Sequence, residues 1–197
     1  MKMATTDVRL TDDEKAILAS MVDKKLELLI HDEYVVNPSA YMSVWLVVDD
    51  AVFEVHREAE ALDHFGSMDD VAVTSVRPAD KDDVRSRIAG RRLVSDKVER
   101  TILDVKVVED CQQMSKSEKV AGTYLFTSAI IFELEGTELV LEPDTWFSED
   151  IFILRGPGVS KKLPNAIEDI SEGDRAHTEA TRKITSMRSW LKTPSQS

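Results

Sequence analysis

Three alternating residues come nearest to metal-binding chemistry in this chain. Glu54, His56 and Glu58 lie two residues apart, so on a β-strand their side chains would project from one face. One imidazole and two carboxylates can hold a divalent cation. A solvated outer face opposite the apolar Phe53 and Val55 explains the same residues, because such spacings are common by chance. We therefore expect neither a metal site nor a cofactor.

Two other candidates for catalysis lack the partners that a reactive group needs. His31 precedes Asp32, and a carboxylate could orient its imidazole as a general base. No nucleophile stands beside this histidine, and histidine is favoured near helix C-termini for electrostatic reasons alone. The single cysteine, Cys111, follows Glu109 and Asp110, whose charges disfavour a reactive thiolate. The sequence therefore indicates no catalytic residue and favours a protein that is not an enzyme.

Four residues are candidates for a surface that binds another protein. Trp146 and Phe147 stand together in a polar segment, where two large aromatic side chains either cover the end of a core or form a contact hot spot. Arg91 and Arg92 belong to a basic cluster, which can bind an acidic group or pair with the aspartates around it. The aromatic pair is the stronger indication of an interaction surface.

The charge balance narrows the class of partner. The 197 residues carry 25 basic and 37 acidic side chains, which gives a net charge of −12. Such a chain is repelled by the phosphates of nucleic acid and by anionic lipid, and it attracts basic proteins. We therefore expect a protein partner of basic charge, or a second copy in a homodimer, and neither nucleic acid nor a membrane.

Composition bounds the architecture and the compartment. Apolar residues make up 42% of the chain and charged residues 31%, which is typical of a globular domain with one core. One cysteine cannot form an intrachain disulfide, and the first residues lack the apolar stretch of a secretory signal. We therefore expect a cytoplasmic protein with a flexible N-terminus over 1–10, one α+β domain over 11–192 and a disordered tail over 193–197.

The hydrophobic pattern predicts helices at both ends of this domain. Thr11 and Glu14 form a capping box, and apolar residues at mostly helical spacing follow them. Near the C-terminus, Ala180 and Ile184 belong to a narrow apolar stripe with the spacing of one helix face. The predicted helices cover 11–31, 80–89 and the segment from 171 onward, and 58–65 is predicted to be a short helix or an irregular crossover.

Between these helices, alternating and β-branched residues predict strands joined by tight turns. Asp49–Asp50 and Glu135–Gly136 are typical of short hairpin turns. In one strand, Thr101, Leu103 and Val105 alternate with charged residues, which predicts that these three side chains share a buried face. The predicted strands cover 41–48, 51–56, 71–76, 98–108, 121–134, 139–141 and 151–154.

Adjacent strands joined by short turns pair antiparallel. We therefore predict an α+β fold, an antiparallel meander of about seven strands that forms a curved sheet or partly closed barrel, packed by an N-terminal and a C-terminal helix. The leading functional hypothesis is a non-enzymatic interaction module that acts through its acidic surface. The alternative is a small-ligand-binding or metal-dependent pocket protein, with or without enzymatic activity, whose site lies in the mouth of the curved sheet. The candidate residues for lining that pocket are His56, Glu54, Trp45, Tyr124 and Ser128.

Overall fold

The computed structural model describes residues 4–34, 37–64, 67–86, 89–116, 119–145, 147–166 and 178–190. In chain order its elements are β1 (Ala4–Val8), α1 (Asp12–Ser20), β2 (Lys25–Asp32), β3 (Ser39–Tyr41), β4 (Ser43–Val48), β5 (Ala51–His64), β6 (Ser67–Ala79), the 3₁₀ turn η1 (Lys81–Asp83), β7 (Leu93–Lys116), β8 (Lys119–Leu134), β9 (Thr137–Pro143), β10 (Asp150–Gly156), the 3₁₀ turn η2 (Val159–Lys162), β11 (Thr178–Ser186) and α3 (Met187–Trp190).

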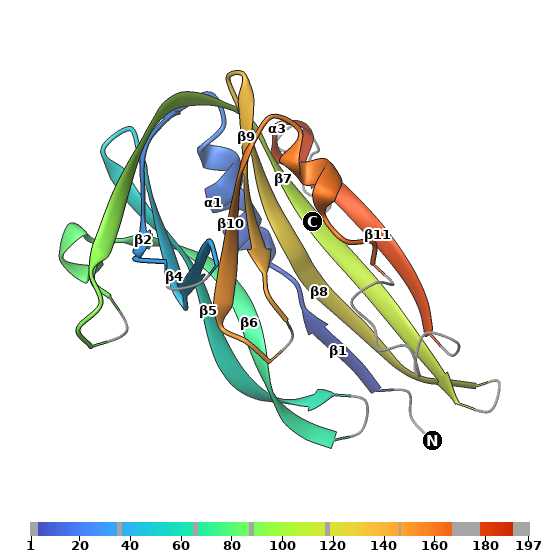
Figure 1. The fold of residues 1–197 in the computed structure, drawn as a ribbon. Coiled ribbons are helices and arrows are strands. Elements are labelled where there is room, and N and C mark those ends of the chain that lie inside the picture. The colour runs from blue at the N-terminus through green and yellow to red at the C-terminus, as the bar shows by residue number, and fades with distance from the viewer. Residues whose placement is uncertain are drawn as a thin grey trace.

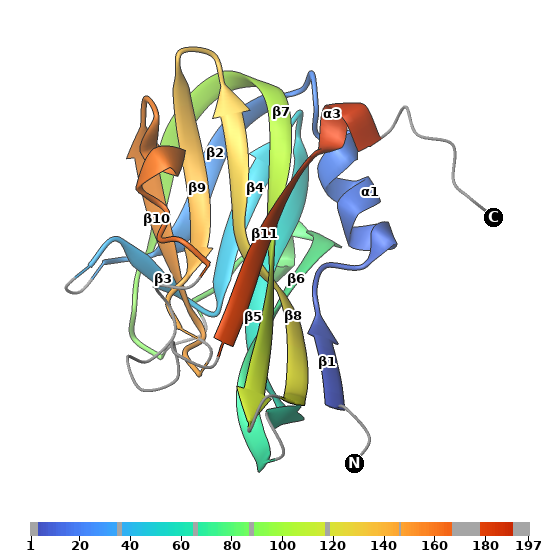
Figure 2. The same cartoon turned by 90° about the vertical axis from the view of Figure 1, so that its right-hand side faces the viewer.

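The eleven described strands form one sheet, which does not close and is antiparallel apart from one parallel pair. Its main path runs β3-β10-β9-β8-β7-β2-β4-β5-β6, with β1 beside β8 and β11 beside β7. The long strand β7 joins the two parts of the sheet, because its first part pairs with β2 and its second part pairs with β8 and β11. The strands on either side of β7 fold toward one another around a shared core (Figures 1 and 2).

The two described α-helices lie together on one side of this curved sheet (Figure 2). Helix α1 buries Leu18, and its C-cap residue Met21, in the main core, and the Glu14 carboxylate accepts a hydrogen bond of 2.9 Å from the backbone N–H of Val76 in β6. The helix therefore covers the concave side of the sheet next to β6. The sequence predicts a flexible segment over 1–10. In the structure this segment contains β1, which pairs with β8.

The fold confirms the antiparallel sheet and a short helix near each end, but it is mostly β rather than the predicted α+β, because it contains more strand and less helix than predicted. The sheet has eleven strands instead of about seven among the described residues. The predicted helix over 11–31 is correct only in its first half. The capping box of Thr11 and Glu14 is present, but α1 ends at Ser20 and Asp23 takes a left-handed φ of 66°. Residues 25–32 then form β2, which pairs with β4 and β7 on its two sides.

Two further helix predictions are wrong because the residues pair with neighbouring strands of the sheet. Residues 58–64 continue β5, which pairs with β6 as far as His64 opposite Ser67. Residues 178–186 form β11, which pairs with β7. Ala180 and Ile184 are four residues apart, a spacing that suits one face of a strand as well as one face of a helix. Only η1 is helical between 80 and 86, residues 87–88 and 171–177 lie outside the described parts, and so does the predicted tail over 193–197.

A bulge in β7 changes which side chains face the core. The register between β7 and β8 shifts between Ile102 and Asp104, and a shift of one residue sends the next side chain to the opposite face. Ile102 is therefore fully buried, whereas Leu103, predicted on the buried face, is 44% exposed. Val105 is buried as predicted.

Smaller apolar clusters cover the convex face of the sheet. In β4, Val44 and Leu46 join the main core, whereas Trp45 packs with Val47 and Val52 in a separate cluster. Because neighbouring side chains of a strand point to opposite faces, Trp45 belongs to the convex face. A third cluster forms where Val159 of η2 packs over β7, β8 and β9.

Candidate functional site

The sheet has a break along one edge of β8. In the lower part of this edge β1 is the neighbour, and the paired residues end at Val8 opposite Phe126. In the upper part β9 is the neighbour, and the pairing begins at Leu141 opposite Ile130. Residues 127–129 of β8 therefore lie between the end of its pairing with β1 and the start of its pairing with β9.

A cavity of about 200 Å³ opens at this break. It has room for about seven water molecules, or for a ligand of roughly ten non-hydrogen atoms. Both apolar and polar side chains form its walls. The described lining residues are Val8, Arg57, Val71, Ala72, Thr74, Tyr124, Phe126, Thr127, Ser128, Glu142, Pro143, Asp144, Thr145, Leu163, Pro164 and Arg182.

Arg57 is the most unusual residue in these walls. It follows Phe53 and Val55 on the concave face of β5 and is only 2% exposed. Its Nη2 donates to the carbonyl oxygens of Ala72 at 3.0 Å and Thr145 at 2.7 Å. Its Nε and Nη1 meet no hydrogen-bond acceptor among the described residues. Of the five N–H groups of this guanidinium, three therefore lack an acceptor among the described residues, at nitrogen atoms that are themselves buried.

The charge of Arg57 is retained at neutral pH despite its burial. Burial lowers the pKa of Arg57 from 12.5 to about 10, while Asp144, Glu149 and Asp150 act in the opposite direction. Burial, with Asp144 and Glu149 close by, also raises the pKa of the Asp150 carboxyl. The cavity therefore has one buried cation in its wall and carboxylates nearby.

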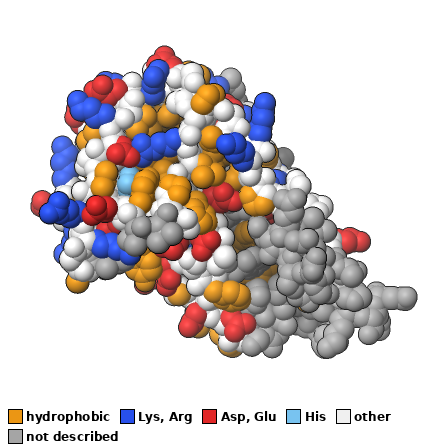
Figure 3. Space-filling model, in the orientation of Figure 1, with side chains coloured by type: hydrophobic (Ala, Val, Ile, Leu, Met, Phe, Trp, Pro, Cys, Tyr) orange, Lys and Arg blue, Asp and Glu red, His pale blue; other side chains and the backbone are white. Residues whose placement is uncertain are grey.

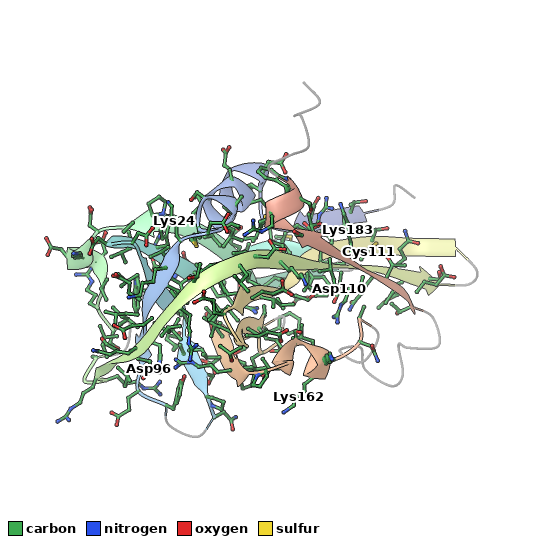
Figure 4. All side chains as sticks on the ribbon, turned by 90° about the horizontal axis from the view of Figure 1, so that it is seen from above. Lys24, Asp96, Asp110, Cys111, Lys162 and Lys183 are labelled. Atoms are coloured by element: carbon green, nitrogen blue, oxygen red, sulfur yellow. The ribbon has the colours of Figure 1, made fainter. Side chains whose placement is uncertain are left out.

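The second arginine of the wall is bound to the protein itself. Arg182 of β11 donates through Nε and Nη2 to the two carboxylate oxygens of Asp110, at 2.7 and 2.6 Å. Its Nη1 donates to the carbonyl oxygen of Pro164. The Asp110 side chain has no exposed surface. It lies on the second half of β7, far from Asp96 at the other end of the strand (Figure 4). Arg182 therefore neutralises a buried carboxylate and has a partner at each of its three nitrogens, whereas Nε and Nη1 of Arg57 have none among the described residues.

Two of the five residues expected to line a pocket lie in this cavity. Tyr124 is 1% exposed, and burial raises the pKa of its phenol to about 12, so the hydroxyl keeps its proton at neutral pH. The Ser128 hydroxyl contacts the cavity and donates to the carbonyl oxygen of Val108 at 3.3 Å. The cavity reaches both faces of the sheet at the break, because Arg57 lines it from the concave face and Leu163 from the cluster on the convex face.

The other three expected residues lie on the convex face and do not reach the cavity. The Ser43 hydroxyl donates to the carboxylate of Glu54 at 2.6 Å and lies 3.0 Å from Nδ1 of His56. Arg77 binds the second carboxylate oxygen of Glu54. Trp45 packs into the neighbouring apolar cluster. These polar side chains form a buried network, and no group of three His, Cys, Asp or Glu side chains in the described ranges is arranged to hold a metal ion.

The expected interaction residues are distributed over two segments of the surface. Phe147 is 57% exposed in the connection between β9 and β10. Trp146 lies outside the described residues. Arg92 is exposed, Arg91 is half-buried, and the charge of Arg91 acts on Asp150. Acidic side chains gather at the lower end of the molecule, over the β5–β6 hairpin (Figure 3).

Arg57 is the functional candidate that the sequence prediction missed. The sequence carried a signal for it, because Arg57 continues the alternation of Phe53 and Val55 and so places a cation on the buried face of a strand. A helix predicted from residue 58 concealed this pattern, since the strand was expected to end at His56.

Comparison of the chain with protein-family models, with curated proteins and with solved structures found no match. Within the described residues, no helix has both the length and the apolar character needed to cross a bilayer.

Proposed function

We propose that this chain is a small-ligand-binding protein whose site is the cavity at the break between β1 and β9. One observation carries the proposal: the guanidinium of Arg57 is buried in the cavity wall with three N–H groups that meet no acceptor in the described structure. A buried charge without full hydrogen bonding destabilises a fold. A bound ligand that accepts these hydrogen bonds would account for its presence.

The chemistry of the wall favours binding over catalysis. The described lining residues include neither histidine nor cysteine, and the Ser128 hydroxyl donates to the carbonyl oxygen of Val108 rather than to a carboxylate base. A nucleophile of the serine or threonine type needs a base within hydrogen-bond reach. The proposed role is therefore recognition of a small molecule.

A pocket-blocking variant tests this proposal. We would screen a metabolite panel by thermal unfolding, because a ligand that binds only the folded state raises the melting temperature. Ser128→Phe places a ring in the cavity, and Ser95→Phe places the same ring at an exposed position of β7. We expect compounds that stabilise the wild type and Ser95→Phe but not Ser128→Phe. Equal stabilisation of both variants, or no stabilising compound, would contradict the proposal.

A protein-interaction role is the second candidate, and the β5–β6 hairpin supports it. Residues 58–72 contain five acidic residues and neither lysine nor arginine, and Met68 near the turn is 68% exposed. A basic partner, or a basic region of a second copy, complements such a surface.

Neutralising this hairpin tests the second candidate. The test variant is the triple change Glu58→Gln, Glu60→Gln and Asp63→Asn. The control neutralises three exposed acids elsewhere, at Asp80, Asp82 and Asp83. We expect a pull-down partner that binds at low salt, weakens at moderate salt and is lost only from the hairpin variant. A partner retained equally by both variants would exclude the hairpin as its binding surface.

A further inference from the structure

We infer that the ligand of the cavity is a small organic acid with a single carboxylate, held against Arg57. This inference rests on the proposed function and adds the chemical class of the ligand. A carboxylate carries two acceptor oxygens and one negative charge, and guanidinium groups bind carboxylates with strong, charge-assisted hydrogen bonds. Arg57 carries the compensating charge, and three of its N–H groups lack an acceptor among the described residues.

The charges around the cavity favour a monoanion over a dianion. Arg182 is already neutralised by Asp110, so among the described lining residues Arg57 is the cation that remains for a ligand. Asp144 lines the cavity, and Glu149 and Asp150 act on Arg57 from nearby. These carboxylates would repel the second charge of a phosphate or dicarboxylate more than they repel a monoanion.

The shape of the site favours a compact, largely apolar body behind that carboxylate. Val71, Ala72, Tyr124 and Phe126 line the cavity together with Arg57. Burial of an apolar ligand surface against such walls contributes about 25 cal/mol per Å². A monocarboxylate of roughly ten non-hydrogen atoms, such as benzoate, matches both the walls and the volume of about 200 Å³.

Three probes that share one ring separate these possibilities. We would measure benzoate, benzamide and phenyl phosphate binding by calorimetry, at low salt and neutral pH. Benzamide keeps the shape of benzoate without its charge, and phenyl phosphate carries more charge on a larger group. We expect benzoate to bind about tenfold more tightly than either, the difference that one charge-assisted hydrogen bond typically makes.

Matched arginine variants assign the effect to one residue. Arg57→Met removes the cavity cation, and Arg100→Met removes an exposed cation of β7 that lies outside the cavity walls. We expect Arg57→Met to weaken benzoate binding about tenfold or more, to leave benzamide binding unchanged, and Arg100→Met to change neither. If Arg57→Met does not fold, the comparison of the three probes on the wild type decides alone.

The outcomes distinguish this inference from the proposal on which it rests. Benzamide or phenyl phosphate binding as tightly as benzoate would overturn the carboxylate inference while leaving a ligand cavity. If none of the probes binds but other compounds stabilise the wild type and not Ser128→Phe, the carboxylate inference is likewise overturned and the ligand cavity remains. Failure of both the probes and the whole panel would overturn the inference and the proposed function together.

Discussion

Replacing Arg57 with methionine tests whether its buried charge serves a ligand or the fold. The pKa of Arg57 falls from 12.5 to about 10 on burial, which corresponds to about 3 kcal/mol of destabilisation of its charged form at neutral pH. Its hydrogen bonds to Ala72 and Thr145 each contribute about 1.5 kcal/mol, since the donor is charged. The two effects nearly cancel, so we expect Arg57→Met to change the free energy of unfolding by no more than about 1 kcal/mol.

Arg182→Met is the matched comparison, because it removes the other arginine of the same cavity wall. Its loss leaves the carboxylate of Asp110 buried without its cation. Removing one partner of a buried ion pair typically destabilises a protein by about 3–5 kcal/mol. We therefore expect Arg182→Met to be the far more damaging of the two substitutions.

Urea unfolding of both variants, with linear extrapolation to zero denaturant, measures this difference. The slope with urea should stay the same, because neither substitution changes the surface exposed on unfolding by much. If Arg57→Met lost as much stability as Arg182→Met, Arg57 would be a residue that stabilises the fold. Its N–H groups without acceptors would then not indicate a ligand site.

Three further predictions concern the fold around the cavity. Glu14→Ala should destabilise the protein by about 2 kcal/mol in urea unfolding, because Glu14 both caps α1 and accepts a hydrogen bond from β6. Thr11→Ala should cost about 1 kcal/mol, because it removes only the cap. Equal losses would contradict the contact between Glu14 and β6. Ile102→Ala should lower the free energy of unfolding by about 2–5 kcal/mol, whereas Leu103→Ser should change it by less than about 0.5 kcal/mol, and the reverse order would show that the bulge in β7 is misplaced. Burial raises the pKa of Asp96, but hydrogen bonds from His31 and Arg155 outweigh it and hold that pKa below 3.8. The stability that Asp96 contributes is therefore present above pH 3.8 and lost as the pH falls through its lowered pKa. Urea midpoints of wild type and Asp96→Asn should converge toward acid pH, and a constant gap would contradict this.

Local signals in the sequence predicted several elements correctly. The capping box of Thr11 and Glu14 begins α1, and Asp49 and Asp50 form the hairpin turn between β4 and β5, both with positive φ. Aspartate tolerates this left-handed conformation better than most residues. Each of these features depends on residues within four positions of one another, so the sequence contains the information needed to predict it.

Features that depend on distant residues were not predictable in this way. Residues 25–32 have apolar spacings that suit a helix, but β4 and β7 supply hydrogen-bonding partners on both sides, and tertiary context overrides local propensity. The cavity depends on where β1 and β9 separate along β8, which brings Val8 next to Phe126. Tyr124 and Ser128 were candidates because the apolar alternation of their strand is clear in the sequence, whereas Arg57 became recognisable only with the full length of β5.

Proton–nitrogen NMR of the arginine side chains would show directly whether a ligand meets Arg57. The Nε–H signal of Arg57 is identified by its absence from the spectrum of Arg57→Met, and the wild type is titrated with the compound that stabilises it most. We predict a saturable change of the Arg57 Nε–H signal at the concentration that raises the melting temperature, with a smaller change at Arg100, outside the cavity walls. A stabilising compound that leaves the Arg57 signal unchanged would contradict the proposed site.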